Sequence, residues 1–289
     1  MVAHDNTLIG HSNWPRISIV TPSYNQCRYL EETIRSVIFQ DYPNLEYIVM
    51  DGGSTDGSLE LLHRYQSHFS YWTHAPDYGQ ADALARGFQR STGEILGYLN
   101  SDDVLLPGAL RVVANAFQND CKTDLIVGKS ILIDAESRPF YRVPGMSPTF
   151  YSLLFWGSGG FNQPASFWRR APFIAHGLFD TNLRFAFDYD MYLRLTKNGR
   201  SKRIDHYLAA FRIHLTSKTT VLSDIRRTED VLLKQRYGGF NYPVIIRKFA
   251  WLYYYLIYMK MSLALKTRSA ILHEAFPALT PNAQHQLME

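Results

Sequence analysis

Two adjacent carboxylates, Asp102 and Asp103, follow the short apolar run at 95–99. A run of this kind is typical of a strand buried on both faces. Carboxylates at the carboxyl end of such a strand are costly to place unless a cation meets them, and ligands bind at that end of open α/β sheets. Proteins commonly hold Mg²⁺ with one or two carboxylates together with substrate phosphates. The pair therefore indicates a divalent metal site, and the alternative is a solvated turn in which one carboxylate caps the next helix.

Polar loops also follow two earlier apolar runs, at 17–20 and 45–50. The first loop reads T-P-S-Y-N, where Pro22 is expected to end the strand, and the second reads D-G-G-S-T-D-G. Apolar residues at helical spacing separate the runs and predict helices at 29–40, 58–69, 80–90 and 107–117. Such alternation argues for parallel strands joined by crossover helices, with all three loops at one edge of the sheet. The resulting polar cleft would contain four carboxylates: Asp51, Asp56, Asp102 and Asp103.

The composition suits one sizeable domain with a C-terminal appendage, since the chain has 289 residues, 46% hydrophobic and 19% charged. The net charge of +4 permits an anionic substrate or a membrane surface but is no nucleic-acid signature, so no nucleic-acid partner is expected. Cys27 and Cys121 have no paired spacing, which fits a reducing compartment. The N-terminus lacks a basic start followed by an apolar core, so we predict no signal peptide and a cytoplasmic protein.

The glycine-rich phosphate turns of other nucleotide-binding classes are missing. The first strand is not followed by G-x-G-x-x-G, and the chain contains no G-x-x-x-x-G-K-[ST]. These motifs mark dinucleotide-binding domains and P-loop enzymes. A bound diphosphate would then be neutralised by a metal ion.

Six segments in chain order resemble motifs of the family 2 glycosyltransferases with the GT-A fold: T-P-S-Y-N-Q, V-M-D-G-G-S-T-D-G-S, D-Y-G-Q-A-D-A-L-A-R-G-F, L-N-S-D-D, F-D-Y-D-M-Y-L-R-L and F-R-I-H. The resemblance implies an α/β fold with a Rossmann-like, mostly parallel sheet flanked by helices. It implies that a sugar moves from a nucleotide-sugar donor to an acceptor hydroxyl with inversion, using Mg²⁺ or Mn²⁺. Assembly of a surface polysaccharide or glycolipid is the expected setting.

The resemblance covers residues 16–237, and the segments on either side of it differ in their sequence pattern, so three parts are expected. Residues 1–15 would be a loose N-terminus, 16–237 the catalytic domain, and 238–289 a C-terminal helical segment. Within the catalytic domain, residues 16–134 would bind the nucleotide sugar and 135–237 the acceptor.

The resemblance also places residues around the donor. Asp51 would accept a hydrogen bond from the base, as from N3–H of uracil, which favours a UDP-sugar; the alternative is a carboxylate that caps its own turn. Thr21 and Pro22 would border the same base or the ribose. Three side chains of the D-Y-G-Q-A-D segment would lie beside the nucleotide: Asp77, Gln80 and Asp82. For Asp82, a helix-dipole role would also suffice.

Asp103 matches the last carboxylate of the family's D-x-D motif and is the first choice as metal ligand. Ser101 stands at the first position of that motif, so the division of labour with Asp102 stays open. Asp102 would face the ribose or the water shell of the metal. His214 resembles the family's third metal or diphosphate contact, and Arg212 would share its face of a strand at 207–215.

Asp188 and Asp190 would begin a helix, where positions i and i+2 point about 200° apart. The resemblance implies that Asp188 is the base that takes the acceptor proton. Asp190 would hold the helix end, and Arg194 would pair with it at i,i+4. The alternative is that the helix dipole stabilises both acids. Trp156 lies on the presumed acceptor side, where stacking on a sugar and core packing are equally good accounts.

The aromatic segment F-A-W-L-Y-Y-Y-L-I-Y-M, at 249–259, is too short to span a bilayer. Its polar-tipped rings and flanking basic residues suit a membrane interface, and the alternative is a helix packed on the catalytic domain or on a second subunit. The protein would then be free in the cytoplasm or peripheral on the inner face of the cell membrane, and its acceptor a saccharide or a lipid-linked molecule.

Two other functions fit part of the pattern. A sugar nucleotidyltransferase also uses an α/β sheet, but it usually carries a glycine- and Arg/Lys-rich loop after the first strand, and P-S-Y-N-Q-C-R-Y lacks the glycines. A non-catalytic scaffold could bind a membrane or a partner through the aromatic tail, but it would not need Asp103, Asp188 and His214.

Overall fold

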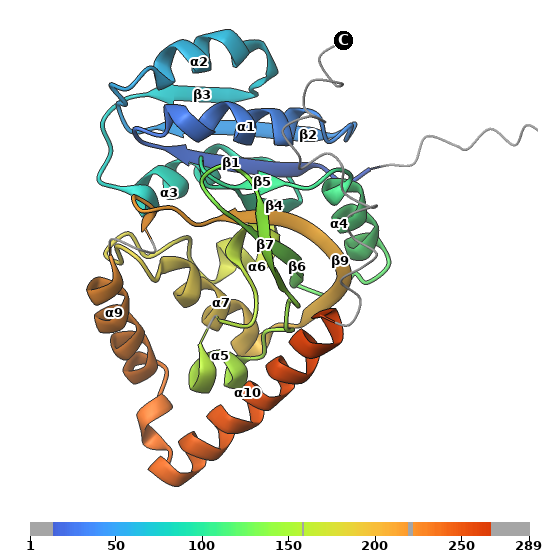
Figure 1. Cartoon of the computed structure of the whole chain (residues 1–289), viewed down its shortest axis with the longest axis vertical. Helices are drawn as coiled ribbons and strands as arrows, with labels where there is room; N and C mark the ends of the chain where they lie inside the picture. Colours follow the sequence, from blue (N-terminus) through green and yellow to red (C-terminus); the bar gives the residue numbers. More distant parts are fainter. Residues whose placement is uncertain (1–13, 158, 219–221, 267–289) are drawn as a thin grey trace, which may run out of the picture.

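The computed structural model describes residues 14–157, 159–218 and 222–266. A nine-stranded sheet runs through it in the order β3-β2-β1-β4-β8-β6-β9-β5, with β7 paired to β6. Figure 1 shows helices around this sheet, with the N-terminal elements at one end and α10 at the other. The predicted fold class, α/β, is confirmed.

The first half of the chain forms the parallel part of the sheet. The strand β1 (Ile17–Ser23) lies between β2 (Leu45–Asp51) and β4 (Ile95–Tyr98), and β3 (Tyr71–His74) continues the sheet beyond β2. All of these pairings are parallel. The helices between them are α1 (Cys27–Ile38), α2 (Ser58–Tyr65), the 3-10 turn η1 (Gln66–His68) and α3 (Gln80–Arg90). Their polar loops therefore emerge at one edge, as the alternation predicts.

The second half contributes mixed pairings. The strand β8 (Ser166–Arg169) pairs antiparallel with β4 and β6 (Leu125–Ile133), and β9 (Ser201–Arg212) pairs parallel with β6. Two short strands, β5 (Val104–Leu105) and β7 (Pro139–Val143), pair antiparallel with β9 and β6. The remaining helices are α4 (Ala109–Gln118), α5 (Phe150–Trp156), η2 (Gln163–Ala165), α6 (Arg170–Ala175), α7 (Phe187–Asn198), α9 (Ser223–Arg236), η3 (Gly239–Asn241) and α10 (Val244–Lys266).

The central strands are buried on both faces, because alternate residues enter different cores. Ile19 packs in the same cluster as Leu30 of α1, whereas Val20 packs in the cluster of Leu84 of α3. This two-sided burial explains why the strands read as continuous apolar runs.

Pro22 does not end β1, which corrects the prediction. The strand continues to Ser23, and Pro22 lies opposite Met50 of β2. On its other side, β1 pairs with β4 only as far as Val20. The proline is tolerated because the strand has a partner on one side only at that point.

The helix expected at 107–117 begins at Ala109. Most of the expected loose N-terminus, 1–15, lies outside the described residues, as does the end of the C-terminal segment. Among the described residues, no helix combines the length and apolar character needed to cross a membrane.

Candidate active site

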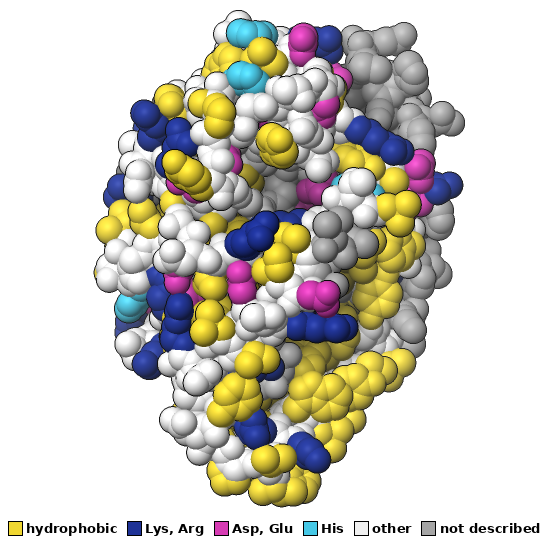
Figure 2. Space-filling model, turned by 90° about the vertical axis from the view of Figure 1, so that its left-hand side faces the viewer, with side chains coloured by type: hydrophobic (Ala, Val, Ile, Leu, Met, Phe, Trp, Pro, Cys, Tyr) yellow, Lys and Arg dark blue, Asp and Glu magenta, His cyan; other side chains and the backbone are white. Residues whose placement is uncertain are grey.

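Side chains tie the polar loops at the carboxyl edge of the sheet to one another. After β1, the backbone N–H of Asn25 donates to Oγ of Ser54, in the loop after β2, at 2.8 Å. At the start of α3, Nε2 of Gln80 donates to Oδ1 of Asn100, after β4, at 2.5 Å. Figure 2 shows a hollow on this side of the molecule, with acidic and basic side chains on its rim. The loops thus come together as the parallel topology requires.

Asp102 and His214 face each other at this edge. Oδ2 of Asp102 lies 3.0 Å from Nε2 of His214, and Nδ1 of the same ring lies 3.0 Å from Oγ1 of Thr216. The ring of Tyr29 packs against the imidazole, with centroids 4.8 Å apart. The Asp102 side chain stays 17% exposed. A carboxylate oxygen and an imidazole nitrogen presented together are suitable ligands for a divalent cation.

Asp103 is buried behind this pair, which does not fit the prediction that it is the first metal ligand. Its Oδ1 accepts the backbone N–H of Arg212 at 2.9 Å, and its Oδ2 accepts Nδ2 of Asn100 at 3.3 Å. Burial, together with the charge of Asp102, raises the pKa of the Asp103 carboxyl well above its usual range. Asp102 is therefore the carboxylate that this loop presents to a ligand.

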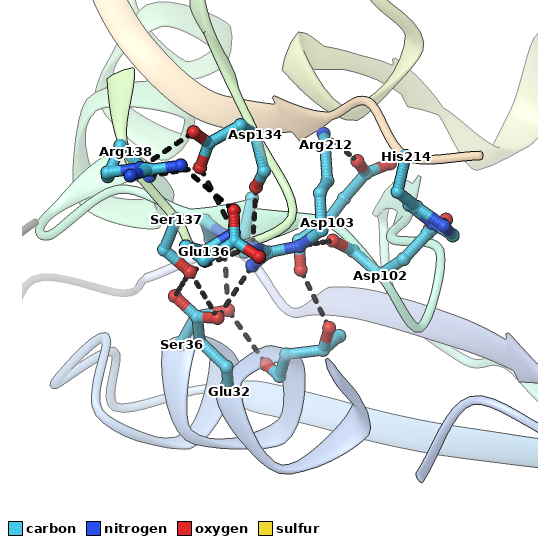
Figure 3. Close-up of polar contacts among 12 residues, drawn as sticks. Glu32, Ser36, Asp102, Asp103, Asp134, Glu136, Ser137, Arg138, Arg212 and His214 are labelled. Carbon is cyan, nitrogen blue, oxygen red and sulfur yellow. Dashed lines mark hydrogen bonds and ion pairs between the residues drawn. The ribbon is translucent and has the colours of Figure 1, made fainter. Parts of the chain in front are cut away.

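The Arg212 guanidinium holds the loop of Asp102 and Asp103 by hydrogen bonds on its buried side (Figure 3). Its Nε donates to the carbonyl oxygen of Asp102 at 2.7 Å, and Nη2 donates to the Glu32 carboxylate at 2.6 Å. Its Nη1 donates to Oγ of Ser137 at 2.8 Å and to the carbonyl oxygen of Asp134 at 3.1 Å. Because β9 ends at Arg212 and the side chain is fully buried, the expectation of a strand face shared with His214 is wrong.

Asp188, in the first turn of α7, approaches this loop from the second half of the chain. Its Oδ2 accepts the hydroxyl of Tyr98, the last residue of β4, at 3.4 Å, and its Oδ1 accepts the N–H of Tyr189 at 2.7 Å. Burial raises the pKa of the Asp188 carboxyl to about 6, and the Tyr189 N–H and the Lys218 ammonium limit the rise. A carboxylate whose pKa lies near the working pH is suited to take a proton from a hydroxyl.

Asp190 turns away from Asp188 and joins α7 to the end of α9. Its Oδ2 accepts Nε of Arg194 at 2.8 Å, which is the expected i,i+4 ion pair. Its Oδ1 accepts the hydroxyl of Tyr237 at 2.8 Å and Nη1 of Arg236 at 3.3 Å. These contacts hold α7 against the end of α9.

Glu229, which the sequence analysis does not single out, fixes the start of α7. Its buried carboxylate, on α9, accepts the backbone N–H groups of Arg184, Phe185 and Ala186 at 2.7, 2.9 and 2.7 Å. These residues immediately precede α7, so α9 orients the helix that carries Asp188. No motif marks Glu229, and only its burial on an otherwise charged, solvated helix distinguishes it.

Lys218 is a partly buried cation at this edge that no motif marks. Its Nζ donates to Oε1 of Gln80 at 2.5 Å and lies 4.8 Å from the ring centroid of Phe187. Burial lowers the pKa of Lys218 to about 8, against the opposing charge of Asp188. The ammonium thus lies between α3 and α7, where it can meet an anionic ligand. The available signal was a basic residue four positions after His214.

Asp51 stabilises its own turn, which is the alternative to the predicted base contact. Its Oδ2 accepts the N–H groups of Gly53 at 3.2 Å and Ser54 at 2.9 Å, and lies 2.6 Å from Nδ1 of His74. Its Oδ1 accepts the hydroxyl of Ser54 at 2.5 Å. The carboxylate is fully buried, so a base could reach it only by displacing one of these groups.

Thr21 and Pro22 are buried within β1 and are not presented to a nucleotide, contrary to the prediction. Oγ1 of Thr21 lies 3.1 Å from the hydroxyl of Tyr47 on β2. Their side chains therefore belong to the interior of the sheet.

A family model described as glycosyl transferase family 2 matches residues 18–180, more than half of the chain. The chain belongs to this family. An uncharacterized glycosyltransferase of Rickettsia prowazekii is 28% identical over 232 residues, which cover 75% of this chain and 70% of the relative. A putative teichuronic acid biosynthesis glycosyltransferase of Bacillus subtilis is 37% identical over 98 residues, which cover 32% of this chain and 38% of the relative.

Solved structures share the fold of this glycosyltransferase. The crystal structure of S. aureus TarS in complex with UDP matches with a TM-score of 0.60 at 18% identity, over 77% of this chain and 65% of that chain. A mannosyltransferase from Pyrobaculum calidifontis, in complex with GDP-Man and Mn²⁺, matches with a TM-score of 0.57 at 20% identity, over 95% of this chain and 79% of that chain. The predicted GT-A fold is thereby confirmed.

In this glycosyltransferase the segment before α3 stays partly open to solvent. Asp77 accepts the N–H of Gly79 at 2.7 Å, and burial raises the pKa of its carboxyl. Asp82 accepts the N–H of Tyr78 at 3.2 Å and pairs with Arg86 at 3.7 Å, so it serves the start of the helix. Of the three predicted residues, Gln80 is the one whose contacts connect it to Lys218 and the loop after β4.

Trp156 packs against α10, with its ring centroid 5.2 Å from that of Tyr258. The ring is half-buried and packs on α10, and its role toward an acceptor stays a prediction.

Proposed function

We propose that this glycosyltransferase moves a sugar from a nucleoside-diphosphate sugar, with UDP-sugars favoured, to an acceptor hydroxyl with inversion. The observation that carries the proposal is the convergence on one cleft edge of the Asp102–His214 pair, the Asp188 carboxylate and the Lys218 ammonium. Together they offer metal ligands, a base and a cation for the leaving group. The UDP complex of TarS and the GDP-Man complex of the Pyrobaculum mannosyltransferase support a nucleotide-sugar donor.

Asp102 and His214 would hold a divalent cation, Mg²⁺ or Mn²⁺. In the part of the chain that the structure describes, no group of three or more His, Cys, Asp or Glu side chains is arranged to hold a metal ion. Two protein ligands still fit such a cation, because diphosphate oxygens and waters can complete its coordination. When bound, it would neutralise charge on the departing nucleoside diphosphate. The Mn²⁺ in the mannosyltransferase complex supports this assignment.

Asp188 would take the proton of the acceptor hydroxyl. The acceptor oxygen attacks the anomeric carbon, the bond from that carbon to the diphosphate oxygen breaks, and the nucleoside diphosphate leaves with the electron pair. The hydroxyl proton passes to a carboxylate oxygen of Asp188. A single displacement from the face opposite the leaving group inverts the anomeric centre, so one base is sufficient. Lys218, preorganised by Gln80, would stabilise the charge that develops on the diphosphate.

We also propose that residues 16–237 form the catalytic domain, with 16–134 serving the donor and 135–237 the acceptor. Asp102 comes from the first of these parts, and Asp188 and His214 come from the second. The activity would serve assembly of a surface polysaccharide or glycolipid, and the name of the Bacillus subtilis relative supports this setting.

A thermal-shift panel tests the proposed function. UDP, GDP, dTDP and CMP are each added to the full chain with and without Mn²⁺. We expect UDP to stabilise the protein only when the metal is present, by about 5 °C at a concentration 100 times its Kd, because a ligand that binds only the folded state shifts unfolding by mass action. If no nucleotide stabilises the protein under any condition, the proposal fails and the non-catalytic scaffold becomes the better account.

The pH profile of kcat/KM should be bell-shaped. Below about pH 6 Asp188 is protonated and cannot take a proton, and above about pH 8 Lys218 loses the charge that meets the diphosphate. Each limb should fall tenfold per pH unit. Steady-state rates of UDP release provide the measurement. Lys218→Arg should move the basic limb of the profile to higher pH, because a guanidinium stays protonated. If the basic limb does not move, it reports the titration of another group.

A further inference from the structure

The helix α10 presents an apolar stripe to solvent. Six side chains that recur every three or four residues form this outer stripe: Ile245, Phe249, Leu252, Leu256, Met259 and Leu263. Residues at this spacing lie on one face of a helix. Phe249 is 65% exposed, and the other members are between 37% and 60% exposed. Figure 2 shows hydrophobic side chains gathered along the lower part of the molecule, where α10 lies in Figure 1. Exposed apolar surface of this extent marks an interaction site.

The opposite face of α10 is fixed to β7 and α5. Oγ of Ser262 lies 2.9 Å from the hydroxyl of Tyr141 on β7, and Tyr258 packs on Trp156 of α5. Ser262 and Leu265 are buried there. The helix therefore lies along the domain, and this attachment decides which of its faces points outward.

The charge of α10 is entirely positive. Its sequence contains four basic residues and no Asp or Glu: Arg247, Lys248, Lys260 and Lys266. Lys248 and Lys260 are exposed beside the outer stripe. Beside α5, a hollow of about 370 Å³ is lined by Phe155, Val244, Arg247, Lys248 and Trp251. An apolar stripe bordered by cations is complementary to an anionic lipid surface, where apolar side chains enter the acyl boundary and lysines meet phosphates.

We propose that α10 lies on the surface of an anionic phospholipid bilayer, with the outer stripe at the boundary between head groups and acyl chains. Tyr253 and Tyr255 are exposed on the same helix. They suit the boundary between head groups and acyl chains, because aromatic rings with a polar tip concentrate at membrane interfaces. A second copy of the chain fits less well. Two such helices facing each other would bring lysines together, with no acid on either helix to pair with them.

Vesicle flotation with the full chain tests this proposal. The wild type should float with phosphatidylcholine vesicles that contain phosphatidylglycerol and stay behind with pure phosphatidylcholine. Phe249→Glu should weaken binding at least tenfold, because it places a charge in the outer stripe. Lys260→Gln should weaken it about fivefold, the equivalent of the ~1 kcal/mol that one basic residue contributes near an anionic surface. Added salt should weaken the binding of the wild type.

Phe39→Glu is the matched control, because Phe39 is 64% exposed but lies at the end of α1. Phe39→Glu should float like the wild type. Phe249→Glu should keep metal-dependent UDP binding, which would show that this variant is folded and that its loss of vesicle binding is independent of the cleft. The proposal is wrong if the wild type does not float with anionic vesicles or if Phe249→Glu floats equally well. A wild-type dimer that Phe249→Glu converts to a monomer, without vesicle binding by either protein, would assign the stripe to a second copy and overturn the proposal.

Discussion

Asp188→Asn is expected to slow sugar transfer by about 10²–10⁴-fold while UDP binding stays at the wild-type level. The amide cannot take a proton, but it keeps the size of the side chain and can still accept the N–H of Tyr189. Because Asp102 and His214 are unchanged in this variant, the proposed metal site should be intact. The rate is measured as release of UDP from a UDP-sugar, with an acceptor sugar or with water, and the Kd for UDP is measured by calorimetry in Mg²⁺.

Asp190→Asn provides the matched control two residues along the same helix. The Asp190 carboxylate accepts hydrogen bonds from Arg194, Arg236 and Tyr237. It has no role in the proposed proton transfer. Its loss should lower the free energy of unfolding by about 1–3 kcal/mol, with a smaller effect on the rate than Asp188→Asn. Asp188 is not the base if its substitution leaves the rate unchanged. Loss of UDP binding together with the rate would instead make it a binding residue.

Asp102→Asn should weaken metal-dependent UDP binding about 100-fold or more, since even outer partners of metal ligands contribute 10–100-fold to metal affinity. Asp102 presents its Oδ2 beside His214, and an amide is a much poorer ligand than a carboxylate. In the presence of EDTA the wild type and the variant should bind UDP equally weakly. Calorimetric titrations in Mg²⁺ and in EDTA give the Kd for UDP of the wild type and of the variant under both conditions.

Asp103→Asn separates the two neighbouring carboxylates. Its amide would turn an N–H group toward the N–H donor of Asn100 in a buried setting, so the melting temperature should fall. Metal-dependent UDP binding should nevertheless remain. If Asp103→Asn loses this binding and Asp102→Asn keeps it, the assignment drawn from the geometry is reversed and the original motif match is correct.

Periodicity predicted the first half of the fold well, for a physical reason. Strands buried on both faces must be apolar throughout, and helices on the faces of the sheet must repeat their apolar residues at helical spacing, so β1 and β2 begin at the predicted residues and α3 has the predicted bounds. The two residues of β5 carry no such signal, because they are held by pairing with β9, about a hundred residues later. Local sequence could not predict that pairing.

The motifs predicted which loops meet but not which way their side chains turn. Asp102 and Asp103 are adjacent, and Arg212, from the end of β9, decides that Asp103 is the buried one. Asp51 is similarly enclosed by its own turn and by His74, at the end of β3. Lys218 and Glu229 lie outside the motifs. The contacts that distinguish them, to Gln80 and to the residues before α7, come from the tertiary structure.

A structure of the full chain with UDP and Mg²⁺ bound would decide which residues hold the metal ion and which one takes the proton. We expect a metal ion that contacts the Asp102 carboxylate and the diphosphate, with His214 beside it, the Lys218 ammonium turned toward the diphosphate, and Asp188 left free to face an acceptor. A metal ion bound by Asp103, or a nucleotide seated away from the loops that follow β1, β2 and β4, would contradict this expectation.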